Sequence, residues 1–534
     1  MLANGLLKGV DKYFSVGDGG NYYRLDQIFL VLALSILLRA KNLDQLQYRP
    51  AGEWGRLLGL DRIPEKRTMR EKVKRFSADQ EEVSRWSLEL SEDWLREADC
   101  ATGVLYVDGH VRVYNGKQTQ LPRRYVARQR LCLRGMTDYW LNDGSGLPIF
   151  VVTSPCTDGL LANLRDEIIP RLLKEIPNQP SESELEENPL LARFFIAFDR
   201  EGYSPGFLKE MWENHRISCA TYHKHPKGTW RTDEFEETII TDRHGNERRI
   251  QLAERGSLIG SKAAERLWVR EIRMLTEGGR QVSLITTNFV GFRAHIFASL
   301  RGRWTQENYF KYAMAEFDID RLGGYELEEI DPNHSVTNPL WRDLDYKIRS
   351  LNSKRTRRIL KKESIHVDEQ MTPKQVEDVI ADLAFIQGEI DILEADICRL
   401  KDKRRSIPKK IPFHQLPEEH KFKQFNQSRH QFISTLRIIA YRSETALANE
   451  LRDIELTKES RSILKDIFNT EADLELDEED QCLTVKLHHL SNRKLSQAAK
   501  HLADRLNEAE QTFPGTQIKV RYCVIGMGDN EDIG

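Results

Sequence analysis

Apolar residues at helical spacing dominate the first hundred positions of the chain. The run Gln27–Ala40 is almost entirely apolar and predicts a buried helix, while Trp54–Leu60 and Pro64–Phe76 predict two helices joined by a short turn. The last of these carries a series of cations, namely Lys66, Arg67, Arg70, Lys72, Lys74 and Arg75. Such a pair resembles a helix-turn-helix with a basic second helix, although many similar pairs bind nothing. We expect residues 1–99 to form a helical domain that contacts DNA through the first three of these cations.

From about residue 100 the pattern changes to short β-rich runs that alternate with helical segments. The expected elements are a strand at Val104–Asp108, a hairpin at Arg134–Leu141 and Leu147–Thr153, a helix at Leu160–Ile176, a strand at Phe194–Asp199, a helix at Pro205–His215 and a strand at Ile217–Tyr222. Three strands followed by helix, strand, helix and strand is the order of an RNase H-like fold. The predicted fold class is therefore α/β, with an RNase H-like mixed sheet over residues 100–322.

The remaining segments predict additions to this core. Residues 223–283 contain short strand-like stretches separated by turns and predict a β-rich insertion, after which Phe292–Phe317 returns to a helical core pattern. Residues 323–425 are basic and helical, with coiled-coil spacing over Lys374–Leu400. Residues 426–534 predict a small α/β domain. The expected core is thus flanked by a helical domain on the N-terminal side and by mainly helical segments on the C-terminal side.

Composition and charge narrow the class of protein. Of 534 residues, 40% are apolar and 31% are charged, which is typical of a globular protein with several domains and much exposed helix. The net charge of −3 does not indicate a nucleic-acid binder, but cations gather at residues 66–75, 123–134, 347–362 and 401–410. Such clusters either contact phosphates or form solvated helix faces, and the sequence leaves both interpretations open.

Cysteine usage and hydropathy bear on the compartment. Seven cysteines are scattered without a Cys-x-x-Cys pair, which argues for a reducing environment and against a zinc site. The longest apolar run, Ile28–Leu38, is too short to span a bilayer. We therefore expect a cytoplasmic, nucleoid-associated protein that does not enter a membrane.

Three carboxylates occupy positions at which the predicted sheet and a helix bring them together. Asp108 and Asp199 end two predicted strands, which are neighbours in an RNase H-like sheet, so the two side chains are expected to meet at one edge. Glu307 lies on a predicted helix, on or beside the apolar stripe that includes Phe310. A buried acid there is costly unless it is paired or binds a cation. Three converging carboxylates predict a site for two Mg²⁺ or Mn²⁺ ions.

Each acid also has an ordinary explanation. A strand-terminal aspartate is common as a turn or cap residue. Glu307 has Arg303 and Lys311 one turn away on either side, and either cation is a suitable ion-pair partner. The occurrence of all three acids in strand, strand and helix order favours the catalytic interpretation.

The segments around these acids, LYVDGH, FIAFDREGYSP and LRGRWTQENYFKYAM, resemble the three acidic motifs of IS4-type DDE transposases. The third motif is the most specific. That family carries Tyr-x2-Arg-x3-Glu-x6-Lys, and Arg303 and Glu307 match it, with Trp304 following the arginine as is usual. Leu300 and Met314 stand where the family has the tyrosine and the lysine. The resemblance covers the predicted core.

The resemblance implies a transposase in which Asp108, Asp199 and Glu307 hold two divalent ions. Such an enzyme cuts double-stranded DNA at transposon ends and joins the freed 3′-hydroxyl to target DNA. Two ends must be held together, so a homodimer is expected, and Lys374–Leu400 is the candidate interface. Two alternatives stay open. One is a nuclease of the same fold that does not transpose, and the other is a domesticated or decayed relative that binds DNA without cutting it.

Further residues are candidates for DNA contact. Arg303 suits bidentate pairing with a phosphate, and Lys311 is the available substitute for the lysine of the family motif. A cationic segment follows the first acid and contains Arg123, Arg124, Arg128 and Arg130. Trp230, in the predicted insertion, either stacks on a flipped base, as aromatic residues do in transposases with such insertions, or packs inside the insertion. Packing is the commoner role of a tryptophan.

Overall fold

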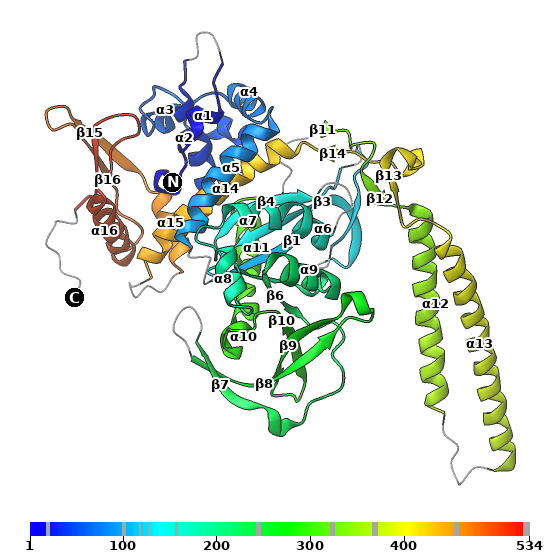
Figure 1. The fold of residues 1–534 in the computed structure, drawn as a ribbon. Coiled ribbons are helices and arrows are strands. Elements are labelled where there is room, and N and C mark those ends of the chain that lie inside the picture. Colours follow the sequence, from blue (N-terminus) through cyan, green and yellow to red (C-terminus); the bar gives the residue numbers. More distant parts are fainter. Residues whose placement is uncertain are drawn as a thin grey trace.

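The structure is a computed structural model of the chain, and it describes residues 1–17, 22–98, 103–116, 119–126, 129–154, 159–241, 247–320, 326–365, 372–452 and 459–526. It is a mixed α/β protein. A bundle of helices at the N-terminal end adjoins a large central sheet, a long helical hairpin projects from the sheet, and a small α/β unit lies at the C-terminal end (Figure 1). The predicted α/β class, with helical segments on both sides of a mixed sheet, is confirmed.

The central sheet holds ten strands in the order β2-β3-β1-β5-β6-β10-β9-β8-β7, with β4 also paired to β3. Its first half comprises β1 (Val104–Val113), β2 (Arg123–Val126), β3 (Leu131–Asn142), β4 (Pro148–Ser154), β5 (Phe195–Phe198) and β6 (Ser218–Tyr222). Strand β1 runs antiparallel to β3 and parallel to β5, which runs parallel to β6. The strands that lead to Asp108 and Asp199 are therefore neighbours, as the sequence predicts.

The β-rich segment predicted at residues 223–283 lengthens this same sheet. It forms β7 (Glu236–Thr241), β8 (Glu247–Ile259), β9 (Leu267–Leu275) and the start of β10 (Gln281–Thr286). Strand β10 pairs antiparallel with β6, and β9, β8 and β7 follow it outward as an antiparallel meander. The insertion thus extends one edge of the sheet beyond the strands that carry the acids.

Helices cover the two faces of the sheet. One face carries α6 (Leu160–Asn163), the π-helical turn η3 (Leu164–Ile168), α7 (Ile169–Glu175) and α9 (Pro205–His215), while α8 (Glu182–Glu187) lies in the connection from α7 to β5. Leu105 and Val107 of β1 point into this cluster. The opposite face carries α10 (Arg293–Gly302) and α11 (Trp304–Glu316), where Tyr106 packs with α10. Since side chains alternate along a strand, Asp108 shares the face of Tyr106 and lies toward α10 and α11.

The N-terminal bundle consists of α1 (Val10–Tyr13), α2 (Leu25–Leu37), α3 (Ala51–Arg56), α4 (Lys66–Phe76) and α5 (Gln80–Glu97). The helix predicted at 54–60 lies three to four residues earlier, and the backbone turns at Gly59, which has a φ of 64°. The bundle is completed by α14 (Gln427–Glu450), which returns from far along the chain. Phe432 of α14 is fully buried among the aromatic rings of Phe14, Phe29 and Trp86.

A buried charge network joins α14 to the central sheet. Asp138 of β3 is fully buried and accepts hydrogen bonds from Nε and Nη2 of Arg112 at 2.5 and 3.0 Å. His430 of α14 places Nε2 3.0 Å from Asp138, and the Thr153 hydroxyl donates to the same carboxylate at 2.9 Å. Asp138 satisfies the polar atom that each of these groups turns toward it, which makes their burial compatible with a stable fold. Nδ1 of His430 is also buried but has no hydrogen-bond partner among the described residues.

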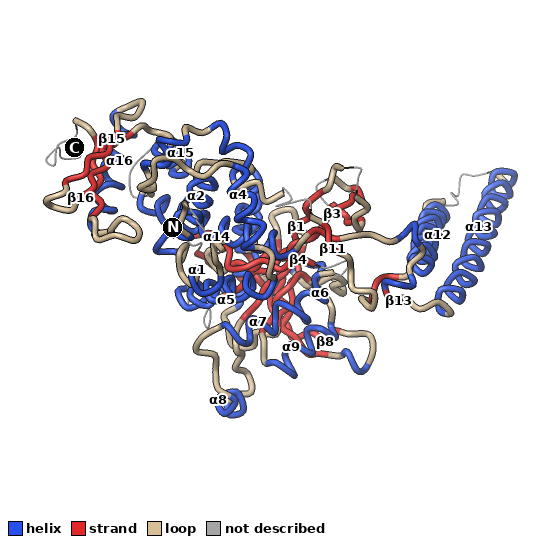
Figure 2. Tube along the Cα trace, turned by 90° about the horizontal axis from the view of Figure 1, so that it is seen from above, coloured by secondary structure: helices blue, strands red, loops and turns tan. Residues whose placement is uncertain are grey.

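Two units follow the core. Helices α12 (Pro339–Glu363) and α13 (Pro373–Arg405) form an antiparallel hairpin that projects away from the other elements (Figures 1 and 2). Its base is tied down by two short strand pairs, β11 (Leu327–Glu328) with β14 (Gln424–Phe425) and β12 (Ser335–Thr337) with β13 (Lys410–Pro412). The C-terminal unit contains α15 (Ser460–Phe468), β15 (Ala472–Asp477), β16 (Cys482–Leu487), α16 (Arg493–Glu508) and β17 (Lys519–Val524).

Candidate active site

Asp108 lies in the middle of β1, where the neighbouring strand on one side stops. The sequence predicted a strand that ends at Asp108, which is wrong, because the long strand β3 pairs with β1 as far as Val113. On the other side, β5 pairs with β1 only up to Val107. Asp108 is therefore the first residue of β1 beyond the end of β5, and the amide of Gly109 donates to its Oδ1 at 2.8 Å.

Asp199 follows directly after β5 and lies beside Asp108. The parallel pairing of Val107 with Phe198 puts the two aspartates at the same level of the sheet. The carbonyl of Asp199 accepts hydrogen bonds from the Thr221 hydroxyl at 3.1 Å and from the amide of Gly202 at 2.9 Å. These bonds fix the backbone at the strand end, so the Asp199 side chain is held on a short, constrained turn.

Glu307 sits in the first turn of α11, which is anchored on the sheet by the residue before it. Gln306 is fully buried, and its Nε2 donates to the carbonyl of Trp140 and to Oδ1 of Asn142, both at 2.8 Å. Tyr309, one turn on, packs its ring 5.4 Å from that of Trp140. These contacts fix the position of α11 along β3 and its rotation about its own axis, and thereby the position of Glu307.

Replacement of Gln306 by leucine tests this anchor. The change leaves the Trp140 carbonyl and the Asn142 amide without their buried partner, which costs about 1–3 kcal/mol and frees the first turn of α11. We expect a lower urea midpoint together with a loss of DNA cleavage greater than the loss of stability explains. Thr305→Val is the neighbouring control, because the Thr305 hydroxyl makes no hydrogen bond in the described part of the chain. Unchanged stability in Gln306→Leu would show that the amide is not an anchor.

Arg303 brings the three acids together. Its Nη1 donates to Oδ2 of Asp108 at 2.7 Å, and its Nη2 donates to Oε1 of Glu307 at 3.0 Å. The same Nη2 lies 3.8 Å from Oδ1 of Asp199. The Arg303 side chain is only 10% exposed whereas that of Asp199 is 43% exposed, so the cluster opens to solvent on the Asp199 side.

The electrostatics of the cluster follow from its burial. Burial raises the pKa of Asp108 to about 6, although Arg303 and the Gly109 amide favour the ionised form. Burial alone would lower the pKa of Arg303, but the charges of Asp108, Asp199 and Glu307 raise it. The guanidinium therefore stays charged and neutralises part of a strongly acidic site.

The donor set has the chemistry of a site for hard divalent cations. Three carboxylates offer only oxygen ligands, which Mg²⁺ and Mn²⁺ prefer. Among the described residues, no three His, Cys, Asp or Glu side chains are grouped closely enough to hold a metal ion. The Arg303 guanidinium, which contacts all three acids, lies between them. A cation at this position would replace the guanidinium as the counter-charge.

The predicted DNA contacts on the core differ in position. Arg123 and Arg124 lie on β2, the former exposed and the latter half-buried, and Arg130 is exposed at the start of the β3 hairpin. Arg128 lies outside the described residues. Lys311 is exposed on α11, one turn after Glu307, and is free of ion pairs to the described residues. The exposed cations are thus accessible to a phosphate.

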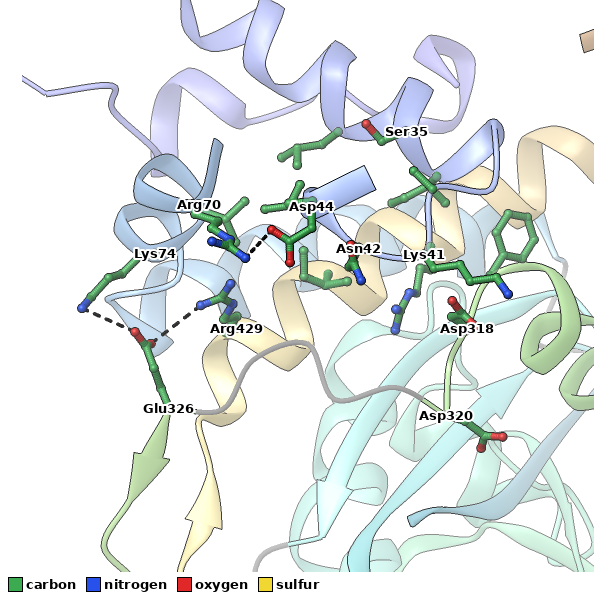
Figure 3. Close-up of a pocket in the computed structure, with 18 of the residues that line it drawn as sticks. Ser35, Lys41, Asn42, Asp44, Arg70, Lys74, Asp318, Asp320, Glu326 and Arg429 are labelled. Carbon is green, nitrogen blue, oxygen red and sulfur yellow. Dashed lines mark hydrogen bonds and ion pairs between the residues drawn. The ribbon is translucent and has the colours of Figure 1, made fainter. Parts of the chain in front are cut away.

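The cations of α4 are partly neutralised. A cavity of about 1380 Å³ lies between the N-terminal bundle, the end of β1 and α14. Figure 3 shows Arg70 beside Asp44 on its wall, and Lys74 and Arg429 beside Glu326. Lys66 bonds to Gln47, and Arg67 pairs with Glu71 of its own helix at 3.2 Å. DNA contact by Arg70 would require it to leave Asp44.

Trp230 is packed inside the insertion. It is 9% exposed and contacts Phe235 and Ala253. The guanidinium groups of Arg255 and Arg273 lie 4.8 and 4.3 Å from its ring centroid. Stacking on a base would require the ring to be uncovered, so the packed alternative describes this structure.

Two residues of the site were not among the sequence-based candidates. Tyr222 ends β6, the neighbour of β5, and its pKa is raised, first by burial and also by the charges of Asp199 and Glu307, while Arg303 opposes the shift. Its place at the end of the next parallel strand was a usable signal. Gln306 gave none, because nothing in a lone glutamine beside a glutamate indicates burial. Leu300, at the position of the family tyrosine, is 1% exposed and packs in the core.

A family described as "Transposase protein" matches residues 1–526. No curated protein and no solved structure matches the chain. In the described ranges, no helix is both long enough and apolar enough to cross a bilayer.

Proposed function

Because the chain belongs to a family of transposases, we propose that it is a DDE transposase of the IS4 type with an RNase H-like core. In this proposal it cuts double-stranded DNA at transposon ends and transfers the freed 3′ ends to target DNA, acting as a homodimer on two ends. Asp108, Asp199 and Glu307 are its catalytic carboxylates.

One observation carries the proposal. Carboxylates from β1, from the end of β5 and from α11, far apart in the sequence, all lie within 4 Å of the Arg303 guanidinium, at 2.7, 3.8 and 3.0 Å. Gathering three acids around one partly buried cation is electrostatically costly, and such clusters are concentrated at functional sites. The strand order β4-β3-β1-β5-β6, with β1, β5 and β6 parallel, is the order expected for an RNase H-like sheet and supports the same interpretation.

In this proposal the three carboxylates hold two divalent ions, which would activate the attacking oxygen and stabilise the leaving oxygen of the phosphodiester. Arg303 exchanges its carboxylate partners for a phosphate of the bound strand, where its planar guanidinium suits bidentate pairing. Gln306 holds α11 in a fixed position on β3, so that Glu307 stays close to the two aspartates. The open Asp199 side of the cluster admits the DNA.

The test is cleavage and joining of a DNA that carries the repeats flanking the encoding gene. With Mg²⁺ or Mn²⁺, the wild type is expected to nick the repeat end and to yield joined products with a target plasmid. With EDTA neither product forms. Cleavage without joining would support the nuclease alternative. Binding without cleavage under any metal condition would overturn the catalytic assignment.

Replacement of Arg303 by glutamine tests the two roles proposed for it, as the counter-charge that competes with a divalent ion and as a phosphate contact. Removing the positive charge takes away the competitor of a divalent ion, so the dissociation constant for Mn²⁺ is expected to fall by about tenfold, the effect of roughly 1.4 kcal/mol. DNA cleavage should fall at the same time, because the phosphate contact is lost. Isothermal titration with Mn²⁺ measures the first effect. Arg301→Gln is the matched control, since Arg301 has no carboxylate partner in the described structure. Equal Mn²⁺ affinity in Arg303→Gln and wild type would contradict the exchange.

Two observations favour a second candidate, a transposase relative that binds DNA without cutting it. The three acids are not grouped as a metal site in the described structure, and Leu300 is buried where the family motif has a tyrosine. The exposed cations Arg123, Arg130 and Lys311 would serve such a protein equally well. The metal-dependent cleavage experiment decides between the two.

A further inference from the structure

Helix α13 carries two apolar faces, of which only one is used within the chain. The inner face contains Ile386, Ile390 and Ile397, which are four and seven residues apart and are buried against α12. On the nearly opposite side, Phe385 and Ile392 are 69% and 66% exposed. A helix with two apolar stripes is typical of bundles with more than two helices. The hairpin, however, projects from the body with α12 as the only packed neighbour of this helix in the described structure (Figures 1 and 2).

The residues of the outer face follow a regular spacing along the helix. It repeats at alternating spacings of four and three residues and contains Lys374, Asp378, Ala381, Phe385, Gly388, Ile392, Ala395, Arg399 and Asp402. These nine residues form a single stripe on a helix of 33 residues. We call them the outer stripe of α13.

Gly388, at the centre of the outer stripe, has no explanation within the single chain. A Cβ built there would have no atom within 4 Å. Glycine in the middle of a helix costs about 1 kcal/mol relative to alanine. A glycine at the centre of an exposed apolar stripe allows the backbone of another helix to approach closely.

The outer stripe is complementary to an antiparallel copy of itself. Ala381 and Ala395 lie seven residues before and after Gly388, and Phe385 and Ile392 lie three before and four after it. Further out, Asp378 lies ten residues before Gly388 and Arg399 eleven after it, at about 15 and 16 Å along the axis. At the ends, Lys374 and Asp402 lie fourteen residues on either side. Reversal about Gly388 therefore pairs apolar with apolar and each charge with its opposite.

We propose that the outer stripe binds the outer stripe of a second copy of this chain, antiparallel and about a two-fold axis at Gly388. A two-fold contact requires a self-complementary surface, and this stripe meets that requirement at every position. Phe385 packs beside the partner's Ile392, the two Gly388 backbones touch, and Asp378 pairs with the partner's Arg399. A parallel arrangement would instead place Asp378 against Asp378 and Arg399 against Arg399, which is unfavourable.

Acids beside the outer stripe do not prevent this contact. Glu389 is already paired with Arg358 of α12 at 3.0 Å. Asp396 lies 2.9 Å from Arg399 of its own helix, and in the proposed dimer this arginine is shared between Asp396 and the partner's Asp378. The dimer deepens the proposed function, because it supplies the contact that would hold two DNA ends together. Self-association is measured without DNA or metal. A failure of the proposed interface can therefore be told apart from a failure of the catalytic assignment.

Sedimentation equilibrium of the full-length chain tests the interface. The wild type is expected to reach twice its chain mass of 62.1 kDa. The double variant Phe385→Lys/Ile392→Lys is expected to raise the dimer dissociation constant more than about 100-fold, because four large apolar side chains lose their contact. Tyr346→Lys/Leu360→Lys, at exposed apolar positions of α12, is the matched control and should leave it unchanged. Circular dichroism verifies that both variants stay folded. A monomeric wild type, or a dimer insensitive to the first variant, overturns the proposal.

Charge exchange and cross-linking test the direction. Asp378→Arg and Arg399→Asp should each weaken the dimer, and the combination should restore it, since each reversed charge then meets its opposite across the axis. Gly388→Cys should form a disulfide-linked dimer on a non-reducing gel under mild oxidation, whereas the wild type, with Cys398 exposed on the same helix, gives the background. Failure of the double exchange to restore the dimer, together with no cross-link at residue 388, would exclude the antiparallel register.

Discussion

Replacement of Asp199 by asparagine is expected to lower the rate of DNA end cleavage by on the order of 10³-fold, because metal ions at such sites supply several kcal/mol of stabilisation that needs a charged ligand. Asparagine keeps the shape of the side chain and the turn after β5, whose hydrogen bonds use the Asp199 backbone carbonyl. The fold should therefore be unchanged. Asp108→Asn and Glu307→Gln are expected to behave alike, since all three acids contact one guanidinium.

The measurement is the single-turnover rate of nicking at the repeat end with saturating Mn²⁺. Asp166→Asn is the matched control, because Asp166 is exposed on the π-helical turn and lies outside the acidic cluster. Binding of the repeat DNA should stay close to wild type in all four variants. If any of the three cluster variants cleaves at the wild-type rate, that residue is not a catalytic ligand.

Replacement of Asp138 by alanine is expected to lower the free energy of unfolding by about 3–5 kcal/mol, the usual cost of removing one partner from a buried ion pair. Asp138 is the carboxylate that compensates both Arg112 and His430, at 2.5 and 3.0 Å. Without it, two buried cationic or polar groups face each other at the junction of the sheet and α14. Urea denaturation followed by tryptophan fluorescence measures the change. Asp233→Ala, which removes the exposed partner of Arg231, should cost less than about 1 kcal/mol and is the control.

The same network sets a pH dependence. Burial alone would raise the pKa of Asp138, but Arg112 and His430 hold it well below its usual range. A carboxyl with a depressed folded-state pKa stabilises the fold above its unfolded pKa of about 4, and this contribution is lost as the pH falls toward the folded value. The stability difference between wild type and Asp138→Asn should thus be constant from pH 7 to 5 and shrink below about pH 4. A difference that grows on acidification would contradict this sign.

The order of the first strands along the chain and the positions of the first two acids were predictable because both depend on local patterns. Apolar runs placed β1 and β5, and their parallel pairing brings residues 108 and 199 to the same level of the sheet. Glu307 was predictable from the helical stripe that Phe310 continues, and Phe310 is indeed buried. The β-rich character of residues 223–283 was likewise visible, although its continuity with the central sheet was not.

Other features depend on contacts that a local pattern does not contain. The extension of β1 to Val113 follows from the length of its partner β3, which is built by residues some thirty positions later. The location of Arg303 among three acids depends on the angle between α10 and α11. The joining of α14 to the N-terminal helices is a contact between residues more than three hundred positions apart, and its buried polar face gave no indication of the partner.

The return of α14 has a consequence for biosynthesis. Phe432, Leu436 and Ile439 complete the core of the N-terminal bundle, so that core has no closing helix until the ribosome has made some 450 residues. The five N-terminal helices end at Glu97, and α14 ends at Glu450. At about 5–20 residues per second, these helices therefore wait for roughly 18 to 70 seconds with an apolar face uncovered. A nascent or truncated chain that lacks α14 would therefore expose this face and be a substrate for chaperones. Emergence of α14 from the ribosome, rather than emergence of the first five helices, is the event that allows this core to close.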